Sequence, residues 1–278
     1  MRRAERPPGD RTPDPVIVGV LNVTPDSFSD GGDYLDPERA AARAATMLDE
    51  GAQIIDVGGE STRPGSDPVT PEEEVRRVVP VVEKILAERP GAVVSVDTYR
   101  SGTAEAALRA GARVINDVTA LRWDPRLAGV VAEARCPVIL MHMLGEPKTM
   151  QRDPRYDDVV REVREFLAGR VASALAAGVE EENIILDPGI GFGKTLEHNL
   201  GLLNRLDSIV ELGFPVLIGA SRKRFIGRLT GVEEARERLF GTVAANVLAY
   251  ERGATLFRVH DVRANREALE VARAVLRA

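Results

Sequence analysis

The segment from Asn183 to Lys194 combines a carboxylate with a glycine-rich loop. A short apolar run ends at Asp187, and Pro188 then prevents the strand from continuing. Three glycines follow at alternating positions, and their backbone freedom lets a ligand approach closely. The segment is not a phosphate-binding P-loop, because Pro188 stands where that motif needs a glycine. The segment therefore predicts a buried strand that delivers an acid to a ligand-facing loop. A strand-to-helix turn with a solvated aspartate is the structural alternative.

Other apolar runs also end on polar or charged side chains. These are Asn22; Asp56 and Glu60; Asp97 and Thr98; Asn116 and Asp117; His142, between two methionines; Ser221, Arg222 and Lys223; and Arg258, His260 and Asp261. The starts of the runs, such as Val16, Val138 and Val216, are apolar or follow proline. A structural protein has no reason for this asymmetry, so we expect an enzyme or a ligand-binding site.

Short β-branched runs alternate with helical patterns along the chain. The expected strands are Val16–Leu21, Gln53–Val57, Val93–Val96, Arg113–Ile115, Val138–Met141, Ile184–Leu186, Val216–Ile218 and Thr255–Val259. Helix starts are expected at Asp36, at Thr70 (a capping box with Glu73), at Ser101 and at Asp124. Helix ends are expected at Gly51, Gly111, Gly178, Gly213 and Gly253.

Eight strand–helix units in about 260 residues predict a single α/β domain, a (β/α)₈ TIM barrel over residues 15–278. Its active site would lie at the C-terminal ends of the strands. An open, doubly wound sheet is the alternative, but it usually has fewer strands. Residues 1–14, rich in arginine and proline, are expected to form a flexible N-terminal tail.

Composition narrows the class of protein. The chain has 278 residues, a net charge of -6 and no long basic block, which argues against nucleic-acid binding. No apolar stretch approaches the ~20 residues of a membrane span. The single cysteine, Cys136, excludes a disulfide framework within the chain, so a cytoplasmic protein is expected.

The motifs resemble those of the dihydropteroate synthase family over essentially residues 15–270. Residues 21–32 (LNVTPDSFSDGG) are similar to its first signature, and residues 58–65 (GGESTRPG) to its second. Later matches follow in the family's order at 95–98, 115–117, 141–143, 187–194, 221–223 and 258–261. Residues 99–102 and the N-terminal tail depart from the family pattern.

The resemblance implies that 6-hydroxymethyl-7,8-dihydropterin pyrophosphate is joined to p-aminobenzoate, giving 7,8-dihydropteroate and pyrophosphate, with Mg²⁺. Pyrophosphate would leave first, and the amine would then attack the resulting cation. No covalent nucleophile is indicated, so catalysis would depend on positioning and on neutralising the leaving group. Small molecules are therefore the expected partners.

The resemblance also implies roles for individual residues. The pterin would be bound by Asp97, Asn116, Met141, Asp187, Phe192, Lys223 and Arg258. Pyrophosphate would be bound by Asn22, Thr62, Arg63, Arg258 and His260, with Asn22 as the metal ligand. The p-aminobenzoate pocket would include Thr62, Arg63, Pro64, Phe192, Ser221 and Lys223. The catalytic set would be Asn22, Arg63, Lys223, Arg258 and His260.

Structural alternatives exist for several of these residues. Arg258 could pair with Asp261 or Asp56 and only tie strands together. His142 and His198 are expected to be structural, with His198 on a solvated helix. The loops at 23–33 and 60–69 are long and rich in glycine and proline, and they are expected to close over the ligands.

Two other functions are the competing hypotheses. A methyltetrahydrofolate-corrinoid methyltransferase uses a related barrel but should lack the Ser-Thr-Arg-Pro-Gly loop and the Ser-Arg-Lys strand end, and both are present here. A non-catalytic pterin-binding subunit should have lost the pyrophosphate site, but Asn22, Arg63, Arg258 and His260 are all in place. A homodimer is a family expectation, to which the helix expected at Glu233–Arg252 could contribute.

Overall fold

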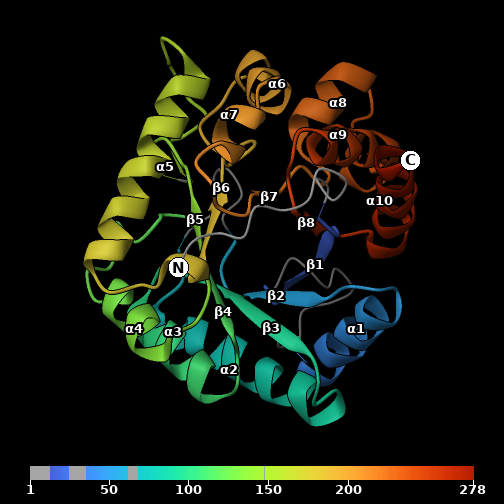
Figure 1. Ribbon diagram of the computed structural model, residues 1–278. Helices are drawn as coiled ribbons and strands as arrows, with labels where there is room; N and C mark the ends of the chain where they lie inside the picture. The colour runs from blue at the N-terminus through green and yellow to red at the C-terminus, as the bar shows by residue number, and fades with distance from the viewer. Residues whose placement is uncertain (1–12, 25–35, 62–67, 147) are drawn as a thin grey trace.

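The computed structural model describes residues 13–24, 36–61, 68–146 and 148–278. Figure 1 shows strands at the centre and helices around them. The strands are β1 (Val16–Asn22), β2 (Ile54–Gly58), β3 (Val93–Asp97), β4 (Val114–Asp117), β5 (Val138–Met141), β6 (Ile184–Asp187), β7 (Leu217–Ile218) and β8 (Leu256–Val259).

The eight strands are parallel and run in the order β6-β5-β4-β3-β2-β1-β8-β7. A parallel bridge between Leu186 and Val216 joins β6 to β7, so the sheet curls into a barrel. The predicted (β/α)₈ barrel is confirmed. Five strands extend beyond their predicted ends, so polar residues such as Asn22, Asp97 and Asp187 belong to the strands themselves.

The helices between the strands cover the outside of the barrel. They are α1 (Pro37–Asp49), α2 (Pro71–Glu88), α3 (Ser101–Arg109), α4 (Leu127–Ala134), α5 (Val159–Ala176), α6 (Leu196–Asn204), α7 (Asp207–Val210), α8 (Arg224–Thr230), α9 (Leu239–Glu251) and α10 (Val262–Arg277). Short 3₁₀ turns lie at η2 (Glu181–Asn183) and η3 (Ala235–Glu237). None of the described helices is long and apolar enough to cross a membrane.

The predicted helix signals are partly confirmed. Asp36 caps α1, and all five glycines expected at helix ends have positive φ. Thr70 accepts the amide of Glu73, but the Glu73 carboxylate bonds to Arg77 instead of completing a capping box.

The expected helix start at Ser101 is confirmed, but neither Ser101 nor Asp124 is the capping residue of its helix. Ser101 is the first residue of α3, and its amide donates to the Asp124 carboxylate at 2.9 Å. The other oxygen of Asp124 accepts the amide of Arg126, just before α4 begins. The aspartate joins the start of α3 to the segment before α4, because its carboxylate can accept from both.

The inside of the barrel changes from apolar to polar along the strands. Its apolar layer contains Val18, Val114, Ile139, Leu217 and Leu256. Alternate residues of a strand point to the same face, so the inward positions continue toward the carboxyl ends as Asn22, Asp56, Asp97, Asn116, Met141, Asp187 and Arg258. The other face carries residues such as Ile55 and Val96, which belong to the large core.

Most of the predicted tail, residues 1–12, lies outside the described residues. Beyond it, the Pro13 carbonyl accepts from the Tyr250 hydroxyl at 2.8 Å, and Asp14 pairs with Arg273 and Arg277 of α10. The chain therefore contacts the barrel's outer helices from Pro13 onward.

Candidate active site

Arg258 of β8 lies between two buried carboxylates. Its Nε donates to Asp56 Oδ2 at 2.6 Å, and its Nη2 donates to Asp97 Oδ2 at 3.0 Å. Asn116 Nδ2 donates to the same Asp56 oxygen at 3.1 Å. Side chains of β2, β3, β4 and β8 therefore meet in one polar cluster at the mouth of the barrel.

This cluster decides between the structural alternatives for Arg258. The pairing with Asp56, one of the two structural alternatives, is present, whereas Asp261 instead holds Arg222 through two hydrogen bonds, at 2.6 and 3.0 Å. Arg258 is thus bound to Asp56 and Asp97 together. Burial opposes the positive charge of Arg258, but the two carboxylates outweigh burial and raise its pKa.

Asp56 is the residue of the cluster that the sequence prediction omitted from the site. It is fully buried, and its Oδ1 has no hydrogen-bond partner among the described residues. A buried acceptor without a partner is costly unless a ligand or water satisfies it. The sequence did contain a signal that could have identified Asp56. It lies two residues before Gly58 on the same strand, and alternate residues of a strand share a face, so Asp56 is on the inward face of β2.

Two carboxylates of the site have strongly raised pKa values. Burial raises the pKa of Asp187 to about 6, although the amide of Gly189, which donates at 2.7 Å, and the charge of Lys223 act against the shift. Burial also raises the pKa of Asp97 to about 7, with Arg258 opposing the rise and the charge of Asp56 adding to it. Both acids can change protonation state near neutral pH.

An apolar wall stands beside these acids. Tyr99, Val118, Met141, Met143 and Met150 form a buried cluster, with Phe192 packed against it. The ammonium nitrogen of Lys223 lies 3.9 Å from the centre of the Phe192 ring. Gly191 permits this approach, because a Cβ at that residue would lie 3.0 Å from the Lys223 side chain. The predicted residues Met141, Phe192 and Lys223 are therefore brought together.

Ser221 and His260 form a second group, beyond β7 and β8. The Ser221 hydroxyl lies 2.9 Å from His260 Nδ1, and the amide of His260 donates to the same hydroxyl at 3.2 Å. Arg43 of α1 donates to the His260 carbonyl. This Ser–His pair was not apparent from sequence, because its members lie 39 positions apart.

The remaining predicted residues divide into two groups. Asn22, at the end of β1, is half-buried, and its side-chain oxygen faces Gly58 beside Asp97. Thr62, Arg63 and Pro64 lie outside the described residues, as do most of the loops at 23–33 and 60–69.

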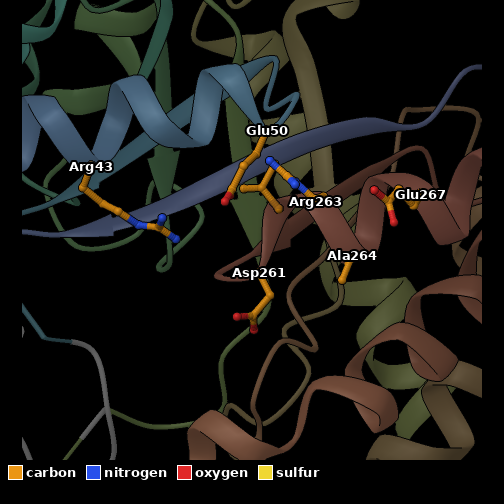
Figure 2. Close-up of a pocket in the computed structure, with 7 residues that line it drawn as sticks. Arg43, Glu50, Asp261, Arg263, Ala264 and Glu267 are labelled. Atoms are coloured by element: carbon orange, nitrogen blue, oxygen red, sulfur yellow. The ribbon is translucent and has the colours of Figure 1, made fainter.

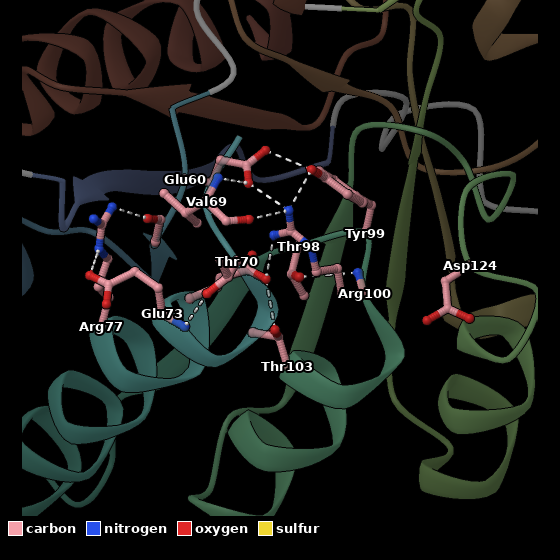
Figure 3. Close-up of polar contacts among 12 residues, drawn as sticks. Glu60, Val69, Thr70, Glu73, Arg77, Thr98, Tyr99, Arg100, Thr103 and Asp124 are labelled. Atoms are coloured by element: carbon pink, nitrogen blue, oxygen red, sulfur yellow. Dashed lines mark hydrogen bonds and ion pairs between the residues drawn. The ribbon is translucent and has the colours of Figure 1, made fainter. Parts of the chain in front are cut away.

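The described flanks of residues 62–67 are held by a buried ionic network, which Figure 3 shows. Arg100 pairs with Glu60 at 2.7 Å and with Glu74 at 2.8 Å, and it also donates to the carbonyl of Val69. The Tyr99 hydroxyl donates to Glu60 at 2.7 Å. Tyr99 and Arg100 thus fix both Glu60 and Val69.

The two other histidines were predicted to be structural. His198 completes a capping box with Thr195 at the start of α6, with both hydrogen bonds at 3.2 Å. His142 is buried beside Lys194. Both histidines make intramolecular contacts.

A surface hollow between α1 and α10 lies apart from the strand-end cluster. Figure 2 shows its lining, which consists of Arg43, Glu50, Asp261, Val262, Arg263, Ala264 and Glu267. None of the inward-facing strand residues belongs to this lining. The chemistry of the strand ends therefore locates the candidate site better than the hollow does.

A parallel barrel with perturbed acids, an amide and cations at its C-terminal mouth defines a (β/α)₈ enzyme. A family described as "Pterin binding enzyme" matches residues 18–260. A dihydropteroate synthase of Neisseria meningitidis is 49% identical over 262 residues, which cover 92% of this chain and 91% of the relative.

Solved structures agree. Xanthomonas albilineans dihydropteroate synthase with 4-aminobenzoic acid superposes with a TM-score of 0.89 and 49% identity, covering 95% of this chain and 93% of that one. A structure of that enzyme in complex with 7,8-dihydropteroate superposes with a TM-score of 0.85 and 46% identity, covering 95% of this chain and 94% of that one. The chain belongs to the dihydropteroate synthase family of pterin-binding enzymes and is a transferase.

Proposed function

We propose that this chain condenses 6-hydroxymethyl-7,8-dihydropterin pyrophosphate with p-aminobenzoate to give 7,8-dihydropteroate and pyrophosphate. The observation that carries the proposal is the set of buried acids and amide at the barrel mouth, Asp97, Asn116 and Asp187. The bound 4-aminobenzoic acid and 7,8-dihydropteroate of the Xanthomonas structures support it.

The pterin edge presents N–H donors beside a carbonyl and a ring nitrogen. Asp187 accepts two of these donors, and Asp97 accepts a further one. Asn116 complements a mixed donor and acceptor edge, and Lys223 donates to the carbonyl and ring nitrogen. These assignments use groups that the structure brings to one end of the barrel.

The flat faces of the ring need apolar or planar neighbours. Met141 and Phe192 supply the wall, and Arg258 supplies a planar guanidinium that can stack on the ring. Asp56 and Asp97 fix the orientation of that guanidinium. We therefore assign Asp56 to the site as the residue that orients Arg258.

The leaving pyrophosphate is assigned to Asn22, Thr62, Arg63, Arg258 and His260. Mg²⁺ would be held by Asn22, whose neutral side-chain oxygen lies beside Gly58 and Asp97 at the carboxyl ends of the strands. The described residues contain no group of three or more His, Cys, Asp or Glu side chains that could hold a metal. One protein oxygen suits Mg²⁺, which often takes its other ligands from phosphates and water. When bound, the ion neutralises charge on the leaving group.

The chain's own residues position the reactants. Asn116, Asp187 and Lys223 orient the pterin so that its methylene faces the amine, and loss of pyrophosphate precedes amine attack. Phe192, Ser221 and Lys223, together with Thr62, Arg63 and Pro64, are assigned to p-aminobenzoate. We assign the Ser221–His260 pair to substrate binding, because this reaction requires charge neutralisation and no serine attack.

Pyrophosphate release tests the proposed reaction. Purified protein with the pterin pyrophosphate should release pyrophosphate and form dihydropteroate when p-aminobenzoate and Mg²⁺ are present. Omitting Mg²⁺ should suppress release. A methyltransferase or a non-catalytic binding subunit would give no dihydropteroate under either condition.

His260→Ala should lower turnover and raise the dissociation constant of pyrophosphate, because one of the groups facing the anion is lost. The melting temperature of the ligand-free protein should change little, since His260 is half-buried and Arg43 bonds to its backbone carbonyl. Calorimetric titration and a thermal melt check both expectations. A sharp fall in melting temperature with unchanged pyrophosphate affinity would make His260 structural.

We also propose a homodimer through the outer face of α9. Phe240 is 85% exposed and Leu248 is 52% exposed, although both are large and apolar. Leu229 of α8 and Leu200 of α6 add exposed apolar surface on neighbouring elements. Such surface is typical of an interaction site.

A Phe240→Glu, Leu248→Glu variant should therefore be a monomer by light scattering at concentrations where the parent is a dimer, because charges would be buried in the interface. Leu175→Glu, on the exposed face of α5, is the matched control and should leave the dimer intact. A monomeric parent protein would contradict the assignment.

The proposed location is the cytoplasm. Cys136 is buried and free, and it is the only cysteine of the chain. A chain without structural disulfides suits a reducing compartment.

A further inference from the structure

Lys194 is a buried lysine at the end of the glycine-rich loop that follows β6. Its side chain is almost completely covered, as is that of His142 after β5. The Lys194 ammonium nitrogen lies 2.9 Å from His142 Nδ1, 3.0 Å from the Phe192 carbonyl and 3.4 Å from the His142 carbonyl. Two segments of the barrel mouth are thus joined by one side chain.

The three acceptors match the three N–H groups of an ammonium ion. This arrangement requires His142 to be neutral, with Nδ1 unprotonated. Burial, together with the nearby charges of Lys194 and Arg122, lowers the pKa of His142 to about 2, so the ring is neutral at physiological pH. The edge of the ring packs against Phe166, with centroids 4.7 Å apart, which holds the acceptor in place.

The loop that Lys194 ties down forms part of the candidate site. Gln151 donates to the Gly191 carbonyl at 2.6 Å, and Tyr156 donates to the Gly193 carbonyl at 2.8 Å. Lys194 adds a charged contact at Phe192, whose ring faces Lys223. Movement of the Phe192 backbone would therefore move a wall of the pocket.

The His142 amide donates to the Asp187 carbonyl at 2.9 Å, so Lys194, bound to the His142 ring, lies close to Asp187. The charge of Lys194 favours the carboxylate form of Asp187, while Asp187 in turn favours the ammonium form of Lys194. Burial lowers the pKa of Lys194 to about 7, and the like charge of Lys223 adds to that effect. The lysine and the aspartate therefore stabilise each other's charged states inside the barrel.

Other charges surround this pair. Lys223 beyond β7 and Arg258 of β8 also favour the Asp187 carboxylate. Arg258, however, is bound to Asp56 and Asp97, and Lys223 lies against the Phe192 ring. Loss of Lys194 should therefore make the carboxylate form of Asp187 less stable, while Lys223 and Arg258 continue to favour it.

We propose that Lys194, with His142 as its acceptor, is a positioning residue for pterin recognition. It anchors Phe192 from behind the pocket and supplies a buried positive charge that supports the Asp187 carboxylate. This inference rests on the proposed role of Asp187 in binding the pterin.

The test is the pH dependence of binding of a pterin analogue that does not itself titrate between pH 5 and 9. For Lys194→Met we expect about tenfold weaker binding at pH 6, where the lysine of the parent protein is protonated, and an upward shift of about half a pH unit or more in the acid limb. Lys84→Met, on α2 at a surface ion pair, should match the parent protein. The shift should disappear when Lys194→Met is combined with Asp187→Asn, because the group that senses the charge is gone.

A pair of His142 variants provides an independent test if Lys194→Met does not fold. Asn at position 142 places an acceptor oxygen close to the position of Nδ1, whereas Leu removes the acceptor. His142→Asn should keep the parent affinity within about threefold, and His142→Leu should lose about tenfold. Equal affinities in these two variants, or an unshifted acid limb in folded Lys194→Met, would overturn the inference. If the parent protein does not bind the analogue at all, the proposed function itself fails.

Discussion

Asp187→Asn should weaken binding of a pterin analogue by about 2 kcal/mol or more, roughly thirtyfold in affinity. The carboxylate accepts the amide of Gly189 with one oxygen and is proposed to accept pterin N–H groups. An amide in its place presents a donor where the ligand also presents donors. The charge-assisted contact is then lost, and a mismatched contact replaces it.

The pH dependence gives this prediction a second readout. Because the pKa of Asp187 is about 6, the parent protein should lose affinity as pH falls through that value and the acid becomes protonated. The Asn variant should lack this step and keep only the one from Asp97, whose pKa is about 7. Calorimetric titrations of the parent protein and of the Asn variant between pH 5 and 8 measure these steps. Asp49→Asn, at the exposed end of α1, is the control, and unchanged affinity in Asp187→Asn would remove Asp187 from the site.

Arg258→Met should have the largest effect on stability. It would leave Asp56 and Asp97 buried with no cation between them, which typically costs about 3–5 kcal/mol of unfolding free energy. Binding of the pterin analogue should also fall sharply, since the planar guanidinium is removed. Arg89→Met breaks an exposed pair with Asp49 and should cost only about 0–1 kcal/mol.

The loss in Arg258→Met should grow with pH. Arg258 lowers the pKa of Asp97, so its removal raises a folded-state pKa that already lies above the ordinary value of 3.8. Between the ordinary pKa and the raised folded-state pKa, the folded protein binds more protons than the unfolded chain. The free energy of unfolding therefore falls as pH rises between these two values. Urea unfolding at pH 5.5 and 8 measures the difference. A loss equal to that of Arg89→Met at both pH values would show that the guanidinium does not hold the two carboxylates.

The side chains of Asp124 and Asp56 show what could not be predicted from the sequence. The Asp124 side chain was expected to cap the next helix, but it accepts from Ser101, the first residue of α3, and from Arg126, just before α4. Asp56 was omitted from the site although it lies on the inward face of β2. Both errors arose because the partners of a polar side chain depend on which neighbouring segments lie within reach of it.

The sequence by itself determined the barrel and the end of the barrel that carries the site. Alternating strands and helices specify the parallel sheet, and the two-residue period places Asp97, Asn116 and Asp187 on its inner face. Only the tertiary structure decided that Arg258 joins Asp56 to Asp97, that Ser221 bonds to His260 and that Lys194 is bound by His142. These contacts join residues 39 to 202 positions apart. They depend on closure of the barrel and on the length and direction of individual side chains, which local sequence patterns do not specify.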